Sequence, residues 1–109
     1  MLYTYKMKVD NGGAPNPWFN LCTLAICKPK IRKHAQIGDY VVGFGSKNDY
    51  SIDKSDHIIY IMKVTQKLTY HQYYQFCQKN LKSKIPNSRN KLGDCIYFLK
   101  NKKYTQIKN

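Results

Sequence analysis

The feature that most constrains this chain is one stretch, residues 14–46, which joins a proline-rich loop, two apolar segments and a basic turn. Pro15 and Pro17 each fix one backbone φ angle and bias the preceding residue toward extended geometry. Trp18 and Phe19 follow directly, so two aromatic rings leave a stiff loop that presents them at small entropic cost. This stretch predicts the core of a recognition site for a flat, anionic ligand.

The rest of the chain reads as short elements joined by turns. Period-two alternation, or a run of β-branched and aromatic residues, indicates a strand, and apolar positions at i, i+3, i+4 and i+7 indicate a helix. Strands are expected at residues 2–9, 21–27 (buried on both faces), 40–44, 57–64, 95–99 and 103–107, helices at 29–35 and 69–80, and surface or irregular segments at 46–56 and 81–92. Many short strands with one or two helices predict an α+β domain built around a small mixed β-barrel.

Charge is strongly biased toward the positive. Lys and Arg number 19 against 6 acidic residues, a net charge of +13, and all the acidic residues are Asp. An AT-rich genome would explain abundant Lys, but it would not explain the absence of Glu. Residues 63–109 account for +10 of this net charge, because they contain eleven Lys and Arg and one Asp. The composition predicts a polyanionic partner.

Compartment and membrane attachment follow from the apolar and cysteine content. The N-terminal residues contain no apolar segment typical of a secretory signal, so we expect a cytoplasmic protein with four reduced cysteines. No apolar run approaches the roughly 20 residues that span a bilayer, so no membrane partner is expected.

Motifs spread over almost the whole chain, in a fixed order, carry a family resemblance. They are Asp10 with Gly12-Gly13, Ala14–Pro17, Cys22–Ala25, Cys27–Arg32, Gly38-Asp39, Gly43, Gly45-Ser46, Met62–Thr65, Lys67–Thr69, Gly93-Asp94 and Ile96-Tyr97. This order resembles the family called nucleotide modification associated domain 2, within the PUA-like group of small barrels that includes the ASCH and EVE domains. The resemblance implies one PUA-like domain over residues 1–109 and a role as a reader or accessory of modified nucleotides.

Related chains tend to continue past the position at which this one stops, so the resemblance implies that the chain is C-terminally short. We therefore expect part of a site, or the surface of a homodimer, to lie in the extension that this chain lacks.

Recognition of a base needs an aromatic face for stacking and polar groups for the base edge. Trp18 or Phe19 would supply the face and Asn16 the edge, with packing at the barrel end as the equally weighted alternative for the two aromatics. A glycine-containing strand end lets a ligand approach the backbone closely. The candidate base-binding residues are Asn16, Trp18, Phe19, Tyr40, Gly43, Gly45, Ser46 and Tyr60, with packing preferred for the two tyrosines.

The basic turn would hold phosphates near such a site, with an affinity that falls as salt rises. Its members are Lys28, Lys30, Arg32 and Lys33. The alternative is a solvated face without a ligand. Further basic residues would extend the track, namely Lys79, Lys82, Lys84, Arg89 and Lys91.

Metal binding and catalysis have weaker signals. Cys22 and Cys27 leave opposite faces of a strand, and their spacing is wider than that of most zinc knuckles, so no metal and no cofactor is expected. There is no Glu, no paired carboxylate and no phosphate-loop motif. One of these thiols with His34 or His57, oriented by Asp39, is the least unfavourable catalytic set. Buried strand thiols would be inert, however, so we assign no catalytic residue.

The sequence therefore favours a binding module that reads a modified or flipped base, on DNA or RNA, with basic residues on the phosphates. Two alternatives stay open. One is an enzyme that acts on a modified base or nucleotide, and the other is a basic scaffold that docks an acidic protein.

Overall fold

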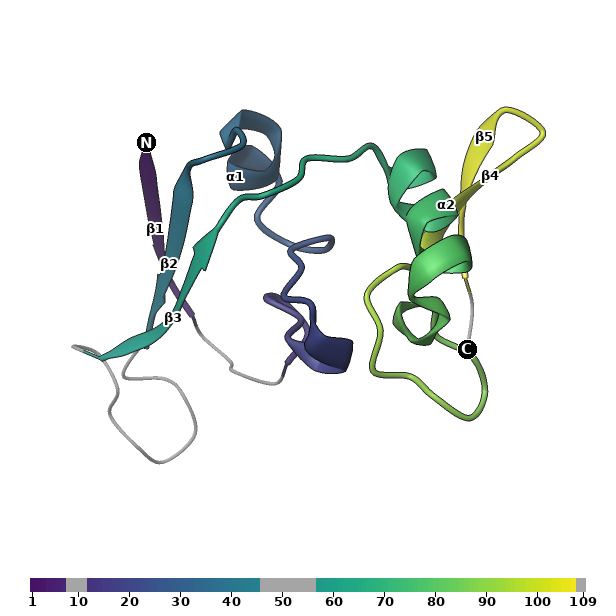
Figure 1. Cartoon of the computed structure of the whole chain (residues 1–109), viewed down its shortest axis with the longest axis horizontal. Helices are drawn as coiled ribbons and strands as arrows, with labels where there is room; N and C mark the ends of the chain where they lie inside the picture. The colour runs from purple at the N-terminus through teal and green to yellow at the C-terminus, as the bar shows by residue number, and fades with distance from the viewer. Residues whose placement is uncertain (8–11, 46–56, 108–109) are drawn as a thin grey trace. The chain divides into compact units, whose positions relative to one another are not determined.

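The structure is a computed structural model that describes residues 1–7, 12–45 and 57–107 (Figure 1). The chain forms two compact units. Unit 1 comprises Met1–Asn11 and Lys28–Lys67, and unit 2 comprises Gly12–Cys27 and Leu68–Asn109. The N-terminal half of the chain thus contributes to both units, because residues 12–27 belong to unit 2, where they pack with the C-terminal segment.

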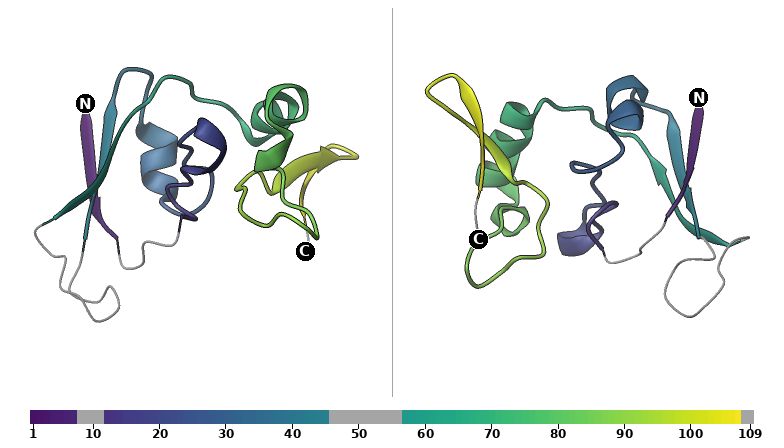
Figure 2. Two further views of the ribbon diagram at one scale, coloured as in Figure 1. Left: turned by 60° about the horizontal axis from the view of Figure 1, so that its bottom comes forward. Right: turned by 180° about the vertical axis from the view of Figure 1, so that it is seen from behind.

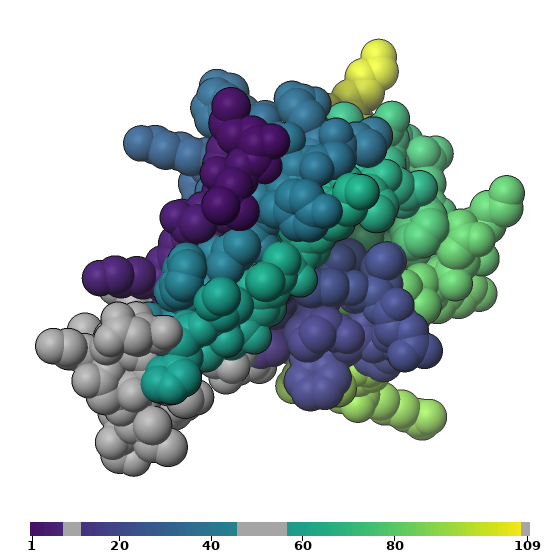
Figure 3. Space-filling view, turned by 60° about the vertical axis from the view of Figure 1, so that its left-hand side comes forward, coloured from purple at the N-terminus to yellow at the C-terminus, as the bar shows by residue number. Residues whose placement is uncertain are grey.

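Unit 1 is built on a three-stranded sheet in the order β1-β2-β3. Strand β1 (Leu2–Lys6) pairs in parallel with β2 (Tyr40–Phe44), which pairs antiparallel with β3 (Ile58–Lys63). The three strands lie side by side across one face of this unit (Figure 3). Val41 and Val42 on the central strand are buried, as the apolar run predicts.

The connection between β1 and β2 contains helix α1 (Pro29–His34). Proline is favoured at the start of a helix because its fixed φ is already helical and its missing N–H would have no intrahelical partner. After α1, Gly38 takes a φ of +95°, and Asp39 accepts hydrogen bonds from the Gln36 N–H at 2.8 Å and the Met1 ammonium at 2.7 Å. This turn directs the chain into β2, as predicted.

Unit 2 packs helix α2 (Tyr70–Asn80) with a hairpin of β4 (Tyr97–Lys100) and β5 (Lys103–Gln106), and these elements appear from two further sides in Figure 2. Two short 3-10 helices, η1 (Trp18–Asn20) and η2 (Lys82–Lys84), complete it. Thr69 caps α2 as predicted. Its hydroxyl accepts the Gln72 N–H at 3.1 Å, while the Gln72 side chain accepts the Thr69 N–H at 2.9 Å.

The apolar stripe predicted for α2 is confirmed. Tyr73 and Cys77 are buried in a cluster with Ala25 and Cys95. Tyr74, Phe76 and Ile85 pack against this cluster at its edge. The core of unit 2 therefore joins the helix to residues on both sides of it in sequence.

The prediction of a buried strand at residues 21–27 is wrong. The segment pairs only through an isolated antiparallel bridge between Thr23 and Asn16, and Cys27 takes a φ of +59°, which interrupts extended backbone. A strand needs a neighbouring strand paired along its length. Here the Thr23 hydroxyl hydrogen-bonds to Lys84 and Asp94 instead. The other predicted elements within the described residues are confirmed with small changes in their ends. The loop predicted at 46–56 lies outside them.

The α+β class is also confirmed. Within residues 1–7, 12–45 and 57–107, five strands form a three-stranded and a two-stranded sheet, accompanied by the helices α1 and α2. Over these residues, neither sheet closes into the small barrel that the sequence predicts.

Candidate functional site

Of the predicted base-binding residues, four described ones lie in unit 1, and Ser46 lies outside the described residues. Tyr40 on β2 is 44 % exposed, with the Lys63 Nζ atom 6.0 Å from its ring centroid. Tyr60 on β3 shares a 2.7 Å hydrogen bond between hydroxyls with Tyr5. A Cβ atom on Gly43 would collide with the Tyr60 ring, so Gly43 makes room for this tyrosine. Gly45 follows β2 and is buried.

The predicted phosphate-binding residues also lie in unit 1, together on and just before α1. Lys30 and Lys33 are exposed, whereas Lys28 and Arg32 are half-buried. The Lys28 Nζ atom lies 4.6 Å from the centroid of the Tyr5 ring, a cation–π geometry that holds the ammonium in place. Lys67 joins the group, because its Nζ atom donates to the Lys33 carbonyl at 2.7 Å. The structure thus groups these cations on and around the short helix α1.

The predicted aromatic loop belongs to unit 2, where Trp18 and Phe19 lie on η1. Trp18 is 40 % exposed, and one part of its indole packs on Gly12, where a Cβ atom would lie 2.7 Å from Nε1. Phe19 is half-buried and takes a φ of +65°. Trp18 therefore combines a packed edge with surface open to solvent.

Asn16, the predicted reader of a base edge, is only 1 % exposed, and its amide is used inside unit 2. Its Nδ2 atom donates to the Leu92 carbonyl at 2.6 Å. Its Oδ1 atom accepts from the Lys84 ammonium at 2.7 Å. The amide therefore ties the proline-rich loop to the segment that follows α2.

Lys84 is the centre of a buried polar network that the sequence did not predict. Its side chain is 0 % exposed, and its Nζ atom also donates to the Asn16 carbonyl at 2.9 Å and to the Thr23 hydroxyl at 3.0 Å. Burial lowers the pKa of the Lys84 ammonium, and the charge of Asp94 opposes that shift. A buried ammonium with all three donors used is a structural cation.

Asp94 supplies the opposite charge and is 2 % exposed. One carboxylate oxygen accepts from the Thr23 hydroxyl at 2.6 Å, and the other accepts from the Tyr73 hydroxyl at 2.5 Å. Loss of solvent, and then the adjacent carboxylate, raise the pKa of Tyr73, so this phenol stays protonated and remains a donor. Thr23 links the two charges, because its oxygen accepts from Lys84 while its proton goes to Asp94.

The cysteines divide into two kinds. Cys77 and Cys95 are buried, and a hydrogen bond between their thiols lowers the pKa of Cys77 and raises that of Cys95. Cys22 and Cys27 are exposed, so the prediction that they are buried strand thiols is wrong. Desolvation raises the pKa of Cys22, which disfavours the thiolate that a nucleophile needs. Among the described residues, no three His, Cys, Asp or Glu side chains gather at one metal site.

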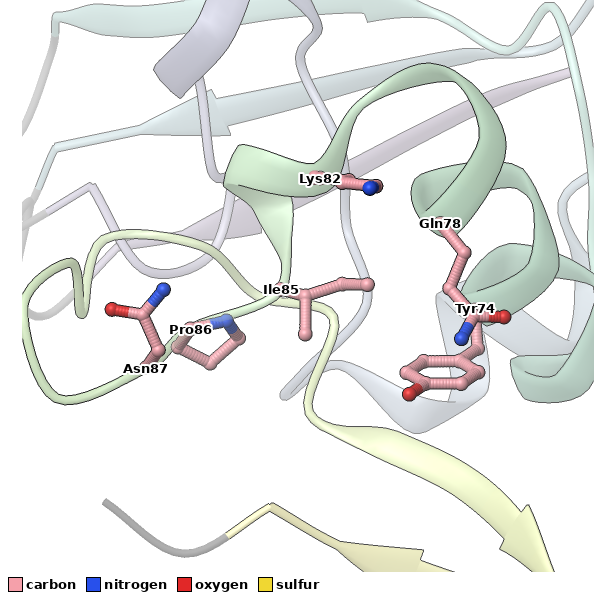
Figure 4. Close-up of a pocket in the computed structure, with 6 residues that line it drawn as sticks. All are labelled: Tyr74, Gln78, Lys82, Ile85, Pro86 and Asn87. Carbon is pink, nitrogen blue, oxygen red and sulfur yellow. The ribbon is translucent and has the colours of Figure 1, made fainter.

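Unit 2 also contains a pocket, with a volume of about 480 Å³, between α2 and the segment after it (Figure 4). Tyr74 and Gln78 come from α2, one helical turn apart. Lys82 comes from η2, and Ile85, Pro86 and Asn87 follow it in sequence. Of these residues, the sequence singled out only Lys82 as a ligand, as part of the extended basic track.

Exposed charge in the described residues is almost entirely positive. Asp39 and Asp94 are the only carboxylate side chains there, and both are engaged in internal hydrogen bonds. All the basic residues that the structure describes in unit 2, apart from Lys84, are exposed, namely Lys79, Lys82, Arg89, Lys91, Lys100, Lys102 and Lys103. The described part of each unit therefore exposes cations, while its one described carboxylate is engaged internally.

The fold and these sites define a small basic α+β protein with a buried polar network and, over the residues that the structure describes, a surface rich in exposed lysines. The chain belongs to the family described as nucleotide modification associated domain 2, whose profile matches residues 1–109. The resemblance seen in the sequence is thereby confirmed, and the family's name links this chain to nucleotide modification. No curated protein and no solved structure matches the chain. Within the described residues, no helix has the length and apolarity needed to cross a membrane.

Proposed function

We propose that this protein is a PUA-like module that binds nucleic acid or a nucleotide with a modified base. The observation that carries the proposal is the surface charge, since both carboxylates in the described residues are engaged in internal hydrogen bonds while most of the described lysines stay exposed. A surface of one sign attracts a polyanion and steers its approach. The family name supports a nucleotide as the chemical class of that anion.

Two parts of the chain supply the recognition chemistry in this proposal. The cations at residues 28–33 contact phosphates, which positions a strand without reading its sequence. Trp18 stacks on a base, which every base allows because each has a π-face. Asn16 supports the loop from inside unit 2, because its amide is already bonded to Lys84 and Leu92.

The direct test is a titration of single-stranded oligonucleotides, with and without modified bases, at two salt concentrations. If the four cations at 28–33 each neutralise one phosphate, affinity falls about 50-fold between roughly 50 and 200 mM salt, from a slope of about −0.7 per contact. Absent or salt-insensitive binding to every nucleic acid would overturn the proposal. Binding to an acidic protein that DNA does not compete would point to a scaffold instead.

Variants separate the two roles. Lys30→Gln is expected to weaken binding to all oligonucleotide sequences alike and to reduce the slope of log affinity against log salt concentration by about 0.7. Lys6→Gln, an exposed lysine of unit 1 outside α1, is the matched control and leaves the slope unchanged. Trp18→Ala is expected to weaken binding by roughly 5- to 150-fold, the equivalent of one base stack, and to reduce base discrimination. Trp18→Phe keeps a π-face and retains most of the affinity.

A further inference from the structure

We propose that the pocket of unit 2 is a nucleobase site, in which a nucleotide places its base between Tyr74 and the two side-chain amides of Gln78 and Asn87. Lys82 then contacts the phosphate of the same nucleotide. This inference rests on the proposed function, because it takes the ligand to be a nucleotide. It adds a second base-binding site to a chain in which the sequence placed base recognition only at residues 14–46 and Tyr60, and gave Lys82 a role only in an extended basic track.

The pocket is an open hollow with room for a base and with an aromatic and an apolar wall. Its volume of about 480 Å³ falls in the range of roughly 300–1,000 Å³ that small-molecule sites occupy. Tyr74 packs against Phe98, at 5.5 Å between ring centroids and 33° between ring planes. Ile85 and the buried Pro86 give the wall an apolar surface (Figure 4).

The polar groups of the pocket suit a base edge. Gln78 and Asn87 each carry an amide, which offers both a donor and an acceptor, the combination that base edges present. The Asn87 Oδ1 atom accepts from the backbone N–H groups of Arg89 and Asn90 at 2.8 and 2.9 Å. These bonds hold the Asn87 side chain in one orientation, while Nδ2 keeps its donors for a ligand.

The charge of the pocket favours an anion. Lys82 is its one charged lining residue, no carboxylate lines it, and in the described part of the chain Lys82 has no ion-pair partner. An aromatic face, two amides and one ammonium together match a base with its phosphate better than an inorganic anion, which would use the ammonium alone.

The test is an NMR titration of the full chain with the four deoxynucleoside 5′-monophosphates, and separately with inorganic phosphate. We expect the nucleotides to shift the side-chain amide signals of Gln78 and Asn87. Gln78→Ala should weaken the preferred nucleotide about fivefold, the equivalent of one net hydrogen bond. Gln75→Ala, an exposed glutamine on the same helix outside the pocket, should leave the affinity unchanged.

A second pair of variants tests the charge of the pocket. Lys82→Gln should weaken nucleotide binding, whereas Lys100→Gln, an exposed lysine of unit 2 that does not line the pocket, should leave it unchanged. Equal amide shifts with phosphate alone would overturn the base site, since the pocket would then recognise an anion only.

The failure of this inference is distinguishable from that of the proposed function. If oligonucleotides bind with salt dependence while Gln78→Ala and Lys82→Gln behave as their controls, the pocket is not the base site and the proposed function stands. If nucleotides bind in the pocket while oligonucleotides do not bind, the pocket stands and the polyanion surface fails. If neither ligand binds, both are overturned.

Discussion

Lys84→Met removes the cation at the centre of the buried network, and its cost follows from the contacts. The Nζ atom makes three hydrogen bonds, at 2.7, 2.9 and 3.0 Å, and the side chain is 0 % exposed. Methionine fills a similar volume but donates none of these bonds. The Asn16 Oδ1 acceptor is then left unpaired, which costs about 1–3 kcal/mol.

Loss of the ammonium also removes the cation that compensates the buried Asp94 charge. Thr23 bridges the two groups, and the carboxylate opposes the lowering of the lysine pKa. Removal of one partner from a buried pair in direct contact typically costs about 3–5 kcal/mol, which sets the upper limit for this bridged pair. We therefore expect Lys84→Met to lower the free energy of unfolding by about 2–5 kcal/mol, a large share of the roughly 5–15 kcal/mol available to a domain.

The measurement is urea unfolding followed by tryptophan fluorescence. Trp18 is the single tryptophan of the chain and belongs to unit 2, so it reports on the unit that contains the network. Lys82→Met, an exposed lysine two residues earlier, is the matched control and is expected to stay within about 0.5 kcal/mol of the wild type. A loss below about 1 kcal/mol in Lys84→Met, or a loss equal to that of the control, would refute the network.

A double-mutant cycle isolates the charge pair. Asp94→Asn keeps most of the shape of the carboxylate and removes its charge, so Lys84→Met should cost less in that background than in the wild type. We expect a coupling of about 1–3 kcal/mol, as for residues that share one buried network. Strict additivity of the two substitutions would show that Lys84 and Asp94 do not stabilise one another.

Two further predictions use the same assay. The raised pKa of Tyr73 means that the fold favours the protonated phenol, so its contribution is present below the ordinary tyrosine pKa of about 10 and is lost as the pH rises above it. Stability should therefore fall less steeply above pH ~10 in Tyr73→Phe than in the wild type, by up to about 1.4 kcal/mol per pH unit, and parallel curves would contradict the assignment. In the β4–β5 hairpin, Asn101 and Lys102 take φ angles of +51° and +64°, a turn that favours Asn-Gly. Lys102→Gly should stabilise the chain by about 0.5–1 kcal/mol, whereas Lys103→Gly, in extended strand, should destabilise it, and a loss in both variants would argue against this turn.

The strands and helices were predicted well because the patterns that indicate them involve residues close together in sequence. Alternation of apolar and polar residues predicted β1, and the Thr69 cap with the tyrosine stripe predicted α2. The segment at 21–27 failed for the opposite reason. Its apolar composition suits a strand, but a strand also needs a partner ladder, and Thr23 is instead committed to Lys84 and Asp94.

The candidate site shows the same division. The cluster at 28–33 was visible because its cations are adjacent in sequence. Asn16 was visible as a polar residue between two prolines, but its role was not, because its partners Lys84 and Leu92 lie 68 and 76 positions away. Lys84 is one of several basic residues between positions 79 and 91. Nothing in the adjacent sequence shows that this lysine is buried while the others are exposed.

The sequence by itself determined the family, the basic character and most of the strands and helices, because these depend on composition and on spacing along the chain. Only the tertiary structure decided which lysine is buried, which carboxylate faces it and which side chains line the pocket of unit 2. The physical reason is distance in sequence. Burial and hydrogen bonding depend on groups such as Asn16 and Lys84, which meet only once the chain has folded.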